Sequence, residues 1–237
     1  MFDDPNLVGY AGLVPALALA ESAGLHELLG EQLSVESPNA VVKSVGVVAG
    51  MLAGADSIDD LDRLRHGGMD KLFDGIRAPS TYGSFLRSFT HGHVKQLDAV
   101  SSRLLARLTA RAPGLLGGGT DPEGIGFVDL DDTIRQVHGY AKQAAAYGYN
   151  KTYGLNAMLA VISTPLAAPV IVASSLRKGN TASGKGSAAM LTRLRWPPLR
   201  SATRVSAWAL NPTLASTASI LAAAVAGSLW GRRSSRA

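Results

Sequence analysis

The sequence predicts a mixed α+β protein with a helical first part, a sheet-forming middle and an irregular or disordered end. Apolar residues recur at helical spacing up to about residue 115, whereas apolar runs typical of strands follow a glycine-rich segment. Neither period persists after about residue 187. We therefore expect four regions: a helical region (1–115), a linker (116–126), an incomplete α/β domain (127–187) and a tail (188–237).

The helical elements follow from the apolar spacing and from capping signals. Residues 7–33 and 41–54 carry apolar residues at helical spacing, and a short acidic helix ends before Gly67-Gly68. Pro79-Ser80-Thr81 is a helix start signal, after which Phe85, Leu86 and Phe89 share one face. Leucines between 97 and 108 then predict a further helix that stops before Pro113.

Three apolar runs predict strands after the glycine-rich stretch LLGGGTDPEG. They are GIGFVDL (124–130), LNAMLAVIST (155–164) and APVIVASSL (168–176). A loop rich in basic and aromatic residues, YAKQAAAYGYNKTYG, separates the first run from the second. This order predicts the opening strands of a mixed sheet.

The charge is divided unevenly along the chain. All 18 acidic residues lie in positions 1–132 together with 10 Lys and Arg, while positions 133–237 contain 13 Lys and Arg and no acid. A basic half favours a polyanionic partner such as DNA; the alternative is that part of this half was never selected as folded protein. The absence of cysteine excludes disulfides and thiolate chemistry and favours the reducing cytoplasm.

Three aspartates gather at the end of the first predicted strand, in FVDLDDT. Alternation along a strand places Asp129 and Asp131 on one face and Asp132 on the other. Oxygen ligands at a strand end suit Mg²⁺. The alternative is a solvated junction between strand and loop with a capping aspartate.

The motif DLDDT resembles the Asp-x-Asp-x-Thr signature of haloacid-dehalogenase phosphatases. That family also implies a downstream lysine and a downstream acidic pair that binds Mg²⁺. No carboxylate follows Asp132, so a phosphatase is the weaker alternative.

A longer series of segments resembles bacterial insertion-sequence transposases of the DDE type, closest to insertion-sequence family 1380 in its actinobacterial form. The segments include NLVGYAGLVPALALAESAGLHELL, VAGMLAGADSIDDLDRLRHGGM, RAPSTYGSFLRSFTHGHVKQLDAV, the stretch from FVDLDDT to APVI, and LRKGN. Together they extend over roughly residues 2–187 and agree in order. The resemblance implies an RNase H-like catalytic domain for residues 127–187, incomplete in this chain.

The resemblance also implies the chemistry. Such enzymes bind the terminal inverted repeats of their element and cut and join DNA with two Mg²⁺ ions held by two aspartates and a glutamate. Asp131 is the favoured first aspartate, with Asp129 second, so both are candidate catalytic and metal-binding residues. Asp132 is expected to lie in the loop that follows the strand, or to support the metal ligands without binding the ion itself. The implied location is the cytoplasm, on the nucleoid, and a homodimer is compatible with the resemblance.

The candidate DNA-binding residues lie in two places. Arg77, Arg87 and Lys95, with His91 and His93, flank the helix that starts at Pro79 and could contact phosphates. Lys142 and Lys151, with Tyr147, Tyr149 and Tyr153, lie in the basic loop after the first strand, where they suit contact with DNA. The alternatives are the solvated face of a core helix and ordinary loop surface. His26 and His66 show no ligand spacing and are expected to be structural.

The later aspartate and glutamate of the family have no counterpart, because positions 133–237 contain no acid. We therefore expect an inactive transposase chain whose reading frame shifts after about Ser187. The alternative is a DNA-binding or regulatory remnant without catalysis. The uncharged run Thr213–Trp230 could be a membrane anchor, but its many Ala, Ser and Thr disfavour this interpretation.

Overall fold

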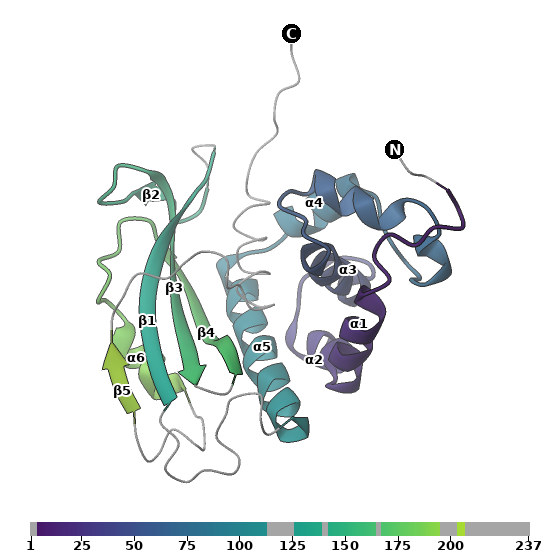
Figure 1. Cartoon of the computed structure of the whole chain (residues 1–237). Helices are drawn as coiled ribbons and strands as arrows, with labels where there is room; N and C mark the ends of the chain where they lie inside the picture. The colour runs from purple at the N-terminus through teal and green to yellow at the C-terminus, as the bar shows by residue number, and fades with distance from the viewer. Residues whose placement is uncertain (1–3, 113–125, 139–141, 165–166, 195–202, 207–237) are drawn as a thin grey trace. The chain divides into compact units, whose positions relative to one another are not determined.

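The computed structural model describes residues 4–112, 126–138, 142–164, 167–194 and 203–206. The chain divides into two units, residues 1–100 and 101–237 (Figure 1). Helices make up the described part of the first unit, and the second contains a five-stranded sheet. The α+β prediction is therefore confirmed. The predicted linker lies almost entirely outside the described residues.

The first unit contains the helices that the apolar spacing predicts. They are α1 (Leu13–Ser22), α2 (Leu25–Gln32), α3 (Ala40–Leu52), the short 3₁₀ helices η1 (Asp59–Arg65) and η2 (Met69–Lys71), α4 (Pro79–Arg87) and the start of α5 (His91–Arg111). Pro79 is the first residue of α4, as its missing N–H allows. The apolar stretch 7–33 is broken at Gly24, whose φ of 85° lies in the left-handed region that glycine tolerates.

Small residues of α3 let its neighbours pack directly against the helix backbone. A Cβ atom at Gly46 would overlap the hydroxyl of Tyr82, and one at Gly50 would overlap a methyl group of Leu61. Tyr82 is fully buried, and its hydroxyl accepts a hydrogen bond of 3.4 Å from the backbone N–H of Arg77. Burial raises the pKa of the Tyr82 phenol. The packing of α4 on α3 therefore depends on Gly46, and that of η1 on Gly50.

The second unit contains a mixed sheet of long strands. Its elements are β1 (Gly126–Gln136), β2 (Ala146–Tyr147), β3 (Tyr153–Thr164), β4 (Ala167–Lys178), α6 (Ser187–Arg193) and β5 (Thr203–Ser206). β3 pairs antiparallel with β1 and β4, and β5 pairs parallel with β1 (Figure 1). The strands predicted at 155–164 and 168–176 are confirmed.

The first strand is longer than predicted. The sequence places its end at Leu130, but every residue from Phe127 to Gln136 has a partner on β3. The aspartates therefore lie within a strand and not at its end, which corrects both the strand-end placement and the junction alternative. Pairing with a long central strand outweighs the low strand propensity of aspartate.

Two described segments of the predicted tail are regular. Residues up to Arg193 form α6, and Thr203–Ser206 form β5, so the expectation of an irregular tail does not hold for these segments. The anchor candidate Thr213–Trp230 lies outside the described residues. Among the residues that the structure describes, no helix combines the length and apolar character needed to cross a membrane.

The sheet has two faces with different partners. On one, Met190 of α6 packs against Met158 and Ala160 of β3, with Leu130 of β1 at the edge of this cluster. We call it the α6 face. Side chains alternate along β1, so Asp132 lies on the α6 face with Leu130, and Asp129 and Asp131 lie on the opposite face.

The α3 glycines give a prediction about stability. Replacing Gly46 by Ala should lower the free energy of unfolding by roughly 1–3 kcal/mol, because the new methyl group overlaps Tyr82. Gly30→Ala in α2 is the control, since its Cβ would meet only a Val41 methyl group at 4.0 Å. Urea unfolding measures both changes. Equal midpoints for the two variants would contradict the packing described here.

Candidate functional site

Asp129 and Asp131 lie side by side on the face of β1 opposite α6. Both side chains are half-buried, and neighbours of the same face on a strand are roughly 6.6 Å apart between Cα atoms. Their partners across β3 are the buried Val161 and the half-buried Leu159. The pair therefore offers carboxylate oxygens against an apolar background, where electrostatic interactions are stronger than in water.

Two carboxylates on one face can contribute ligands to one Mg²⁺ ion. Mg²⁺ is commonly held by one or two carboxylates, with water and substrate phosphates completing the octahedron. Within the described ranges, no group of three or more His, Asp or Glu side chains could hold a metal ion. The two aspartates thus supply part of the ligand set that a metal ion needs.

Asp132 has a different role, which its neighbours on the α6 face define. Its carboxylate lies 2.9 Å from the Arg177 guanidinium of β4 and also accepts a hydrogen bond from the Asn156 amide of β3. Arg177 Nε donates to Asn156 Oδ1 at 2.8 Å, and Nη1 donates to backbone carbonyls of residues 183 and 185. We call these three residues the Asp132–Asn156–Arg177 network. The loop expectation for Asp132 is therefore wrong.

The network is mostly shielded from water. The side chains of Asp132 and Arg177 are each 10% exposed, and Asn156 is buried. Burial lowers the pKa of the Arg177 guanidinium, and the neighbouring Asp132 charge partly opposes this shift. Arginine stays protonated in proteins, so the Arg177 guanidinium keeps its charge within the network.

Arg87, His91, His93 and Lys95 of the predicted basic residues lie around the corner between α4 and α5, whereas Arg77 precedes the other end of α4. Arg87, His91 and Lys95 are exposed, while Arg77 and His93 are half-buried. Phe89 fixes this corner through edge-to-face contacts with Phe85 and His93, at 5.0 and 5.7 Å between ring centroids. The corner thus presents basic side chains on a packed aromatic support.

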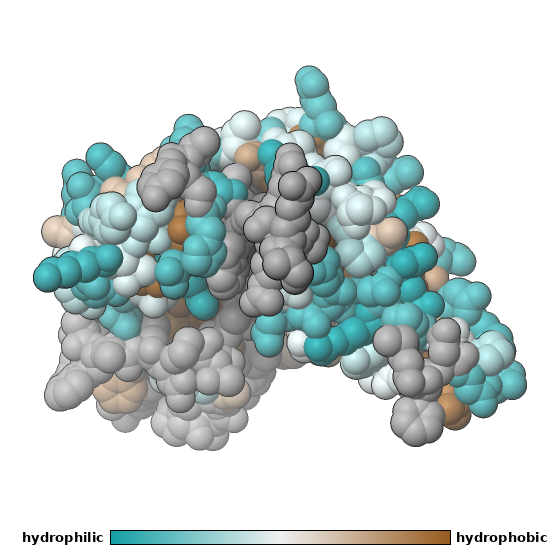
Figure 2. Space-filling model, turned by 90° about the horizontal axis from the view of Figure 1, so that it is seen from above, coloured by the Kyte–Doolittle hydropathy of each residue, from teal (hydrophilic) through white to brown (hydrophobic). Residues whose placement is uncertain are grey.

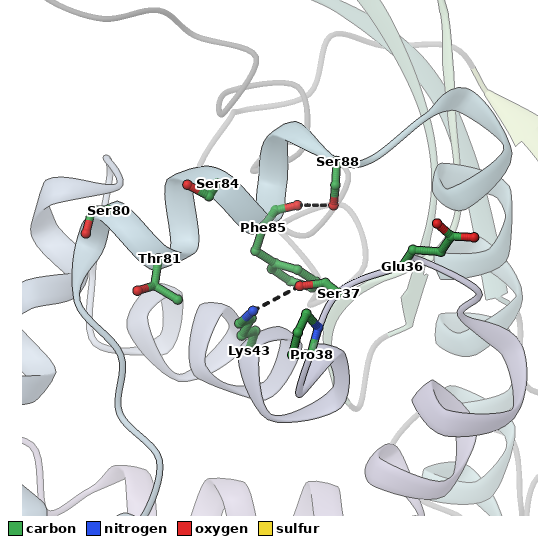
Figure 3. Close-up of a pocket in the computed structure, with 9 residues that line it drawn as sticks. All are labelled: Glu36, Ser37, Pro38, Lys43, Ser80, Thr81, Ser84, Phe85 and Ser88. Carbon is green, nitrogen blue, oxygen red and sulfur yellow. Dashed lines mark hydrogen bonds between the residues drawn. The ribbon is translucent and has the colours of Figure 1, made fainter.

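A polar hollow of about 460 Å³ lies beside α4 (Figure 3). Hydroxyl groups from α4 line one side of it, and Lys43 of α3 and the loop 36–38 line the other. Lys43 Nζ donates to Ser37 Oγ at 2.9 Å and lies 5.7 Å from the centroid of the Phe85 ring. Hydroxyls beside a held ammonium group are donors that suit phosphate oxygens.

Sequence reasoning missed Lys43. A signal was present, because Lys43 is the one charged residue in AVVKSVGVVAGML, the otherwise apolar and small sequence of α3.

The described surface that Figure 2 shows is mainly polar. Hydrophilic side chains cover most of the described surface in Figure 2, and hydrophobic ones show only in small separate areas of that view.

The basic and aromatic loop of the second unit forms a hairpin between β2 and β3. Tyr147 pairs with Tyr153 across it, and Tyr149 and Lys151 are exposed near its tip. Lys142 is half-buried at the start of the segment. The structure thus places Tyr147, Tyr149, Lys151 and Tyr153 on one hairpin, where the sequence predicts a loop.

His26 and His66 remain outside these sites. His26 lies on α2, and His66 Nε2 lies 3.3 Å from an Asp62 carboxylate oxygen. Their structural interpretation stays a prediction.

Comparisons with protein-family models, with curated proteins and with solved structures find no match to this chain.

The network predicts unequal losses of stability when either of two neighbouring aspartates is replaced. Asp132→Ala should lower the free energy of unfolding by roughly 3 kcal/mol, because it leaves the Arg177 charge buried without its partner. Asp131→Ala, one residue away on the other face, should lower it by about 1 kcal/mol or less. Chemical denaturation followed by circular dichroism measures both.

A second substitution tests the cause. Adding Arg177→Met to Asp132→Ala should recover part of the loss, since the unpaired charge is removed. Losses that simply add in the double variant would contradict a coupled network.

Proposed function

We propose that this chain is a DNA-binding transposase chain of the DDE type, descended from an insertion-sequence element, that recognises terminal inverted repeats without cutting them. The observation that carries this proposal is the pair Asp129 and Asp131 on one face of the first strand of a mixed sheet that follows a helical unit. This combination is compatible with the resemblance to family 1380. In a cell, such a protein would work in the cytoplasm on the nucleoid.

The strand order supports an RNase H-like relationship for the second unit. Three long strands, β1, β3 and β4, run antiparallel in succession, then a helix leads to β5, which pairs parallel with β1. Antiparallel strands followed by a crossover to a parallel strand are compatible with the opening of such a domain. β1 lies between β3 and β5, and β5 pairs with it as far as Asp129, so this aspartate has a strand on both sides.

The helical unit supplies the expected contacts with DNA. Exposed Arg87 and Lys95 at the α4–α5 corner are suited to phosphates, and Lys43 of α3 with the α4 hydroxyls adds donors that line the hollow beside α4. Contacts of this kind position a protein on duplex DNA without reading its sequence. Sequence recognition would come from other exposed side chains of α4, among them Ser80 and Ser84.

Asp129 and Asp131 would hold a Mg²⁺ ion together with DNA phosphate oxygens and water. When bound, the ion would neutralise phosphate charge and polarise an attacking water. The two further ligands of the family have no counterpart, since no acid follows Asp132. An ion held by this pair alone would stabilise bound DNA but leave the second position empty, so we propose binding without cleavage.

The phosphatase alternative has less support. Its motif, DLDDT, lies inside a strand that pairs antiparallel along its whole length. The side chains of Asp131 and Thr133 therefore share a sheet face, and the backbone of the motif is occupied by pairing with β3.

The direct test is an electrophoretic mobility shift with the inverted-repeat ends of the element. We expect a specific complex with the end duplex that survives competition by scrambled duplex, and no strand cleavage or transfer with Mg²⁺ or Mn²⁺. Equal binding to both duplexes would remove the proposed recognition. Cleavage would show that the chain is a complete enzyme.

The α4–α5 corner predicts a change in salt dependence. Arg87→Gln and Lys95→Gln should each reduce the slope of log affinity against log salt by about 1, because each removes one phosphate contact. Lys71→Gln is the matched control, an exposed lysine on η2 that bonds Asn6. Fluorescence anisotropy at several salt concentrations gives the slopes. If the slope is unchanged in both corner variants, neither Arg87 nor Lys95 contacts a DNA phosphate.

A further inference from the structure

The hairpin 147–153 is a rigid support for two exposed aromatic rings. At its tip, Gly148 N–H donates to Thr152 O and Lys151 N–H to Gly148 O, both at 3.0 Å. The Asn150 side chain accepts from Thr152 N–H at 3.0 Å, and Lys151 adopts a φ of 60°. The turn is therefore closed by its own hydrogen bonds.

The hairpin is also fixed to the sheet. A Cβ at Gly148 would overlap the Ile134 Cδ1 atom of β1, so the backbone lies directly on that side chain. Gly179 N–H at the end of β4 donates to Ala144 O at 3.1 Å. These contacts hold the tip in one place.

The aromatic rings on this support face solvent. Tyr149 is 89% exposed and Tyr147 is 64% exposed, and they are the two most exposed large hydrophobic residues of the described chain. Tyr147 leans on Tyr153, with ring centroids 5.2 Å apart and planes at 60°. One exposed ring would be ordinary, but two on a closed turn form a surface that loses little conformational freedom on binding.

The charge around the hairpin favours a polyanion. Lys151 at the tip, Lys178 at the end of β4 and Arg135 of β1 are all exposed. The register places Lys178 and Arg135 on either side of Leu155, two residues from Tyr153. No acid occurs anywhere in the sequence from Thr133 onward, so no carboxylate of this segment repels a phosphate.

We propose that the hairpin 147–153 binds unpaired nucleotides of DNA, with Tyr149 and Tyr147 stacking on bases and Lys151 contacting the backbone. Aromatic rings interleaved with lysines are the combination that holds single strands, because every base offers a stacking face. In duplex DNA the bases are stacked on one another inside the helix, so few base faces are available to these rings. The proposal relies on the proposed function only for the choice of DNA.

The position of the hairpin relates it to the aspartate pair. Tyr153 lies six residues along β3 from Leu159, the partner of Asp131, which is roughly 20 Å of strand. A strand end held by the hairpin would therefore be separated from the aspartate pair by a few nucleotides. The two sites can act on the same DNA without overlapping.

The test uses the full chain and fluorescein-labelled oligo(dT) in an anisotropy titration at low salt. We expect Tyr149→Leu to weaken oligo(dT) binding roughly tenfold, because stacking is lost while an apolar side chain remains. Tyr149→Phe should retain the affinity, since its ring still stacks. Residue 149 is at the surface, so circular dichroism should show unchanged folding in both variants.

Three results would overturn the proposal: no oligo(dT) binding by the unaltered chain, equal affinities for Tyr149→Leu and Tyr149→Phe, or tighter binding to oligo(U) than to oligo(dT). Inverted-repeat duplex provides the separate arm. If the unaltered chain binds oligo(dT) but does not recognise the inverted-repeat duplex, only the proposed function is contradicted. If it recognises the duplex but does not bind oligo(dT), only the hairpin proposal is contradicted.

Discussion

The described part of the second unit is organised around the shielded ion pair between Asp132 and Arg177, which Asn156 completes. The three residues come from three adjacent strands, and Arg177 also reaches the backbone of the segment that leads from β4 into α6. An ion pair so shielded is stable only when its remaining polar atoms are satisfied. The Asn156 amide and two backbone carbonyls meet this need, so the pair joins the central strands and fixes the start of α6.

This constraint divides the aspartate cluster by function. Because Asp132 must face Arg177, strand alternation turns Asp129 and Asp131 to the other side. One carboxylate thus stabilises the fold, and the other two are placed together against an apolar background. In the function that we propose, three separate elements have three tasks: the aspartate pair holds an ion, the α4–α5 corner contacts duplex phosphates and the hairpin 147–153 binds unpaired bases.

Local signals in the sequence predicted much of the fold. Pro79 at the start of α4 and the apolar run at 155–164 each depend on near neighbours, so helix and strand were predictable there. The roles of Asp132 and Lys43 were not. The partners of Asp132 lie 24 and 45 residues away, and no local pattern shows such contacts. The extension of β1 to Gln136 was missed for the same reason, since pairing with β3 keeps three aspartates in a strand.

The most direct measurement is the paramagnetic effect of Mn²⁺ on amide NMR signals of the isotope-labelled chain. Mn²⁺ takes the same oxygen ligands as Mg²⁺, and it broadens signals only near its binding site. The division of the cluster predicts that, as Mn²⁺ is added, the signals of Asp129, Asp131, Leu159 and Val161 broaden first and most strongly. The Asn156 and Arg177 side-chain signals should broaden less, and Asp131→Asn should show no such gradient. Broadening centred on Asn156 and Arg177, or none at all, would contradict it.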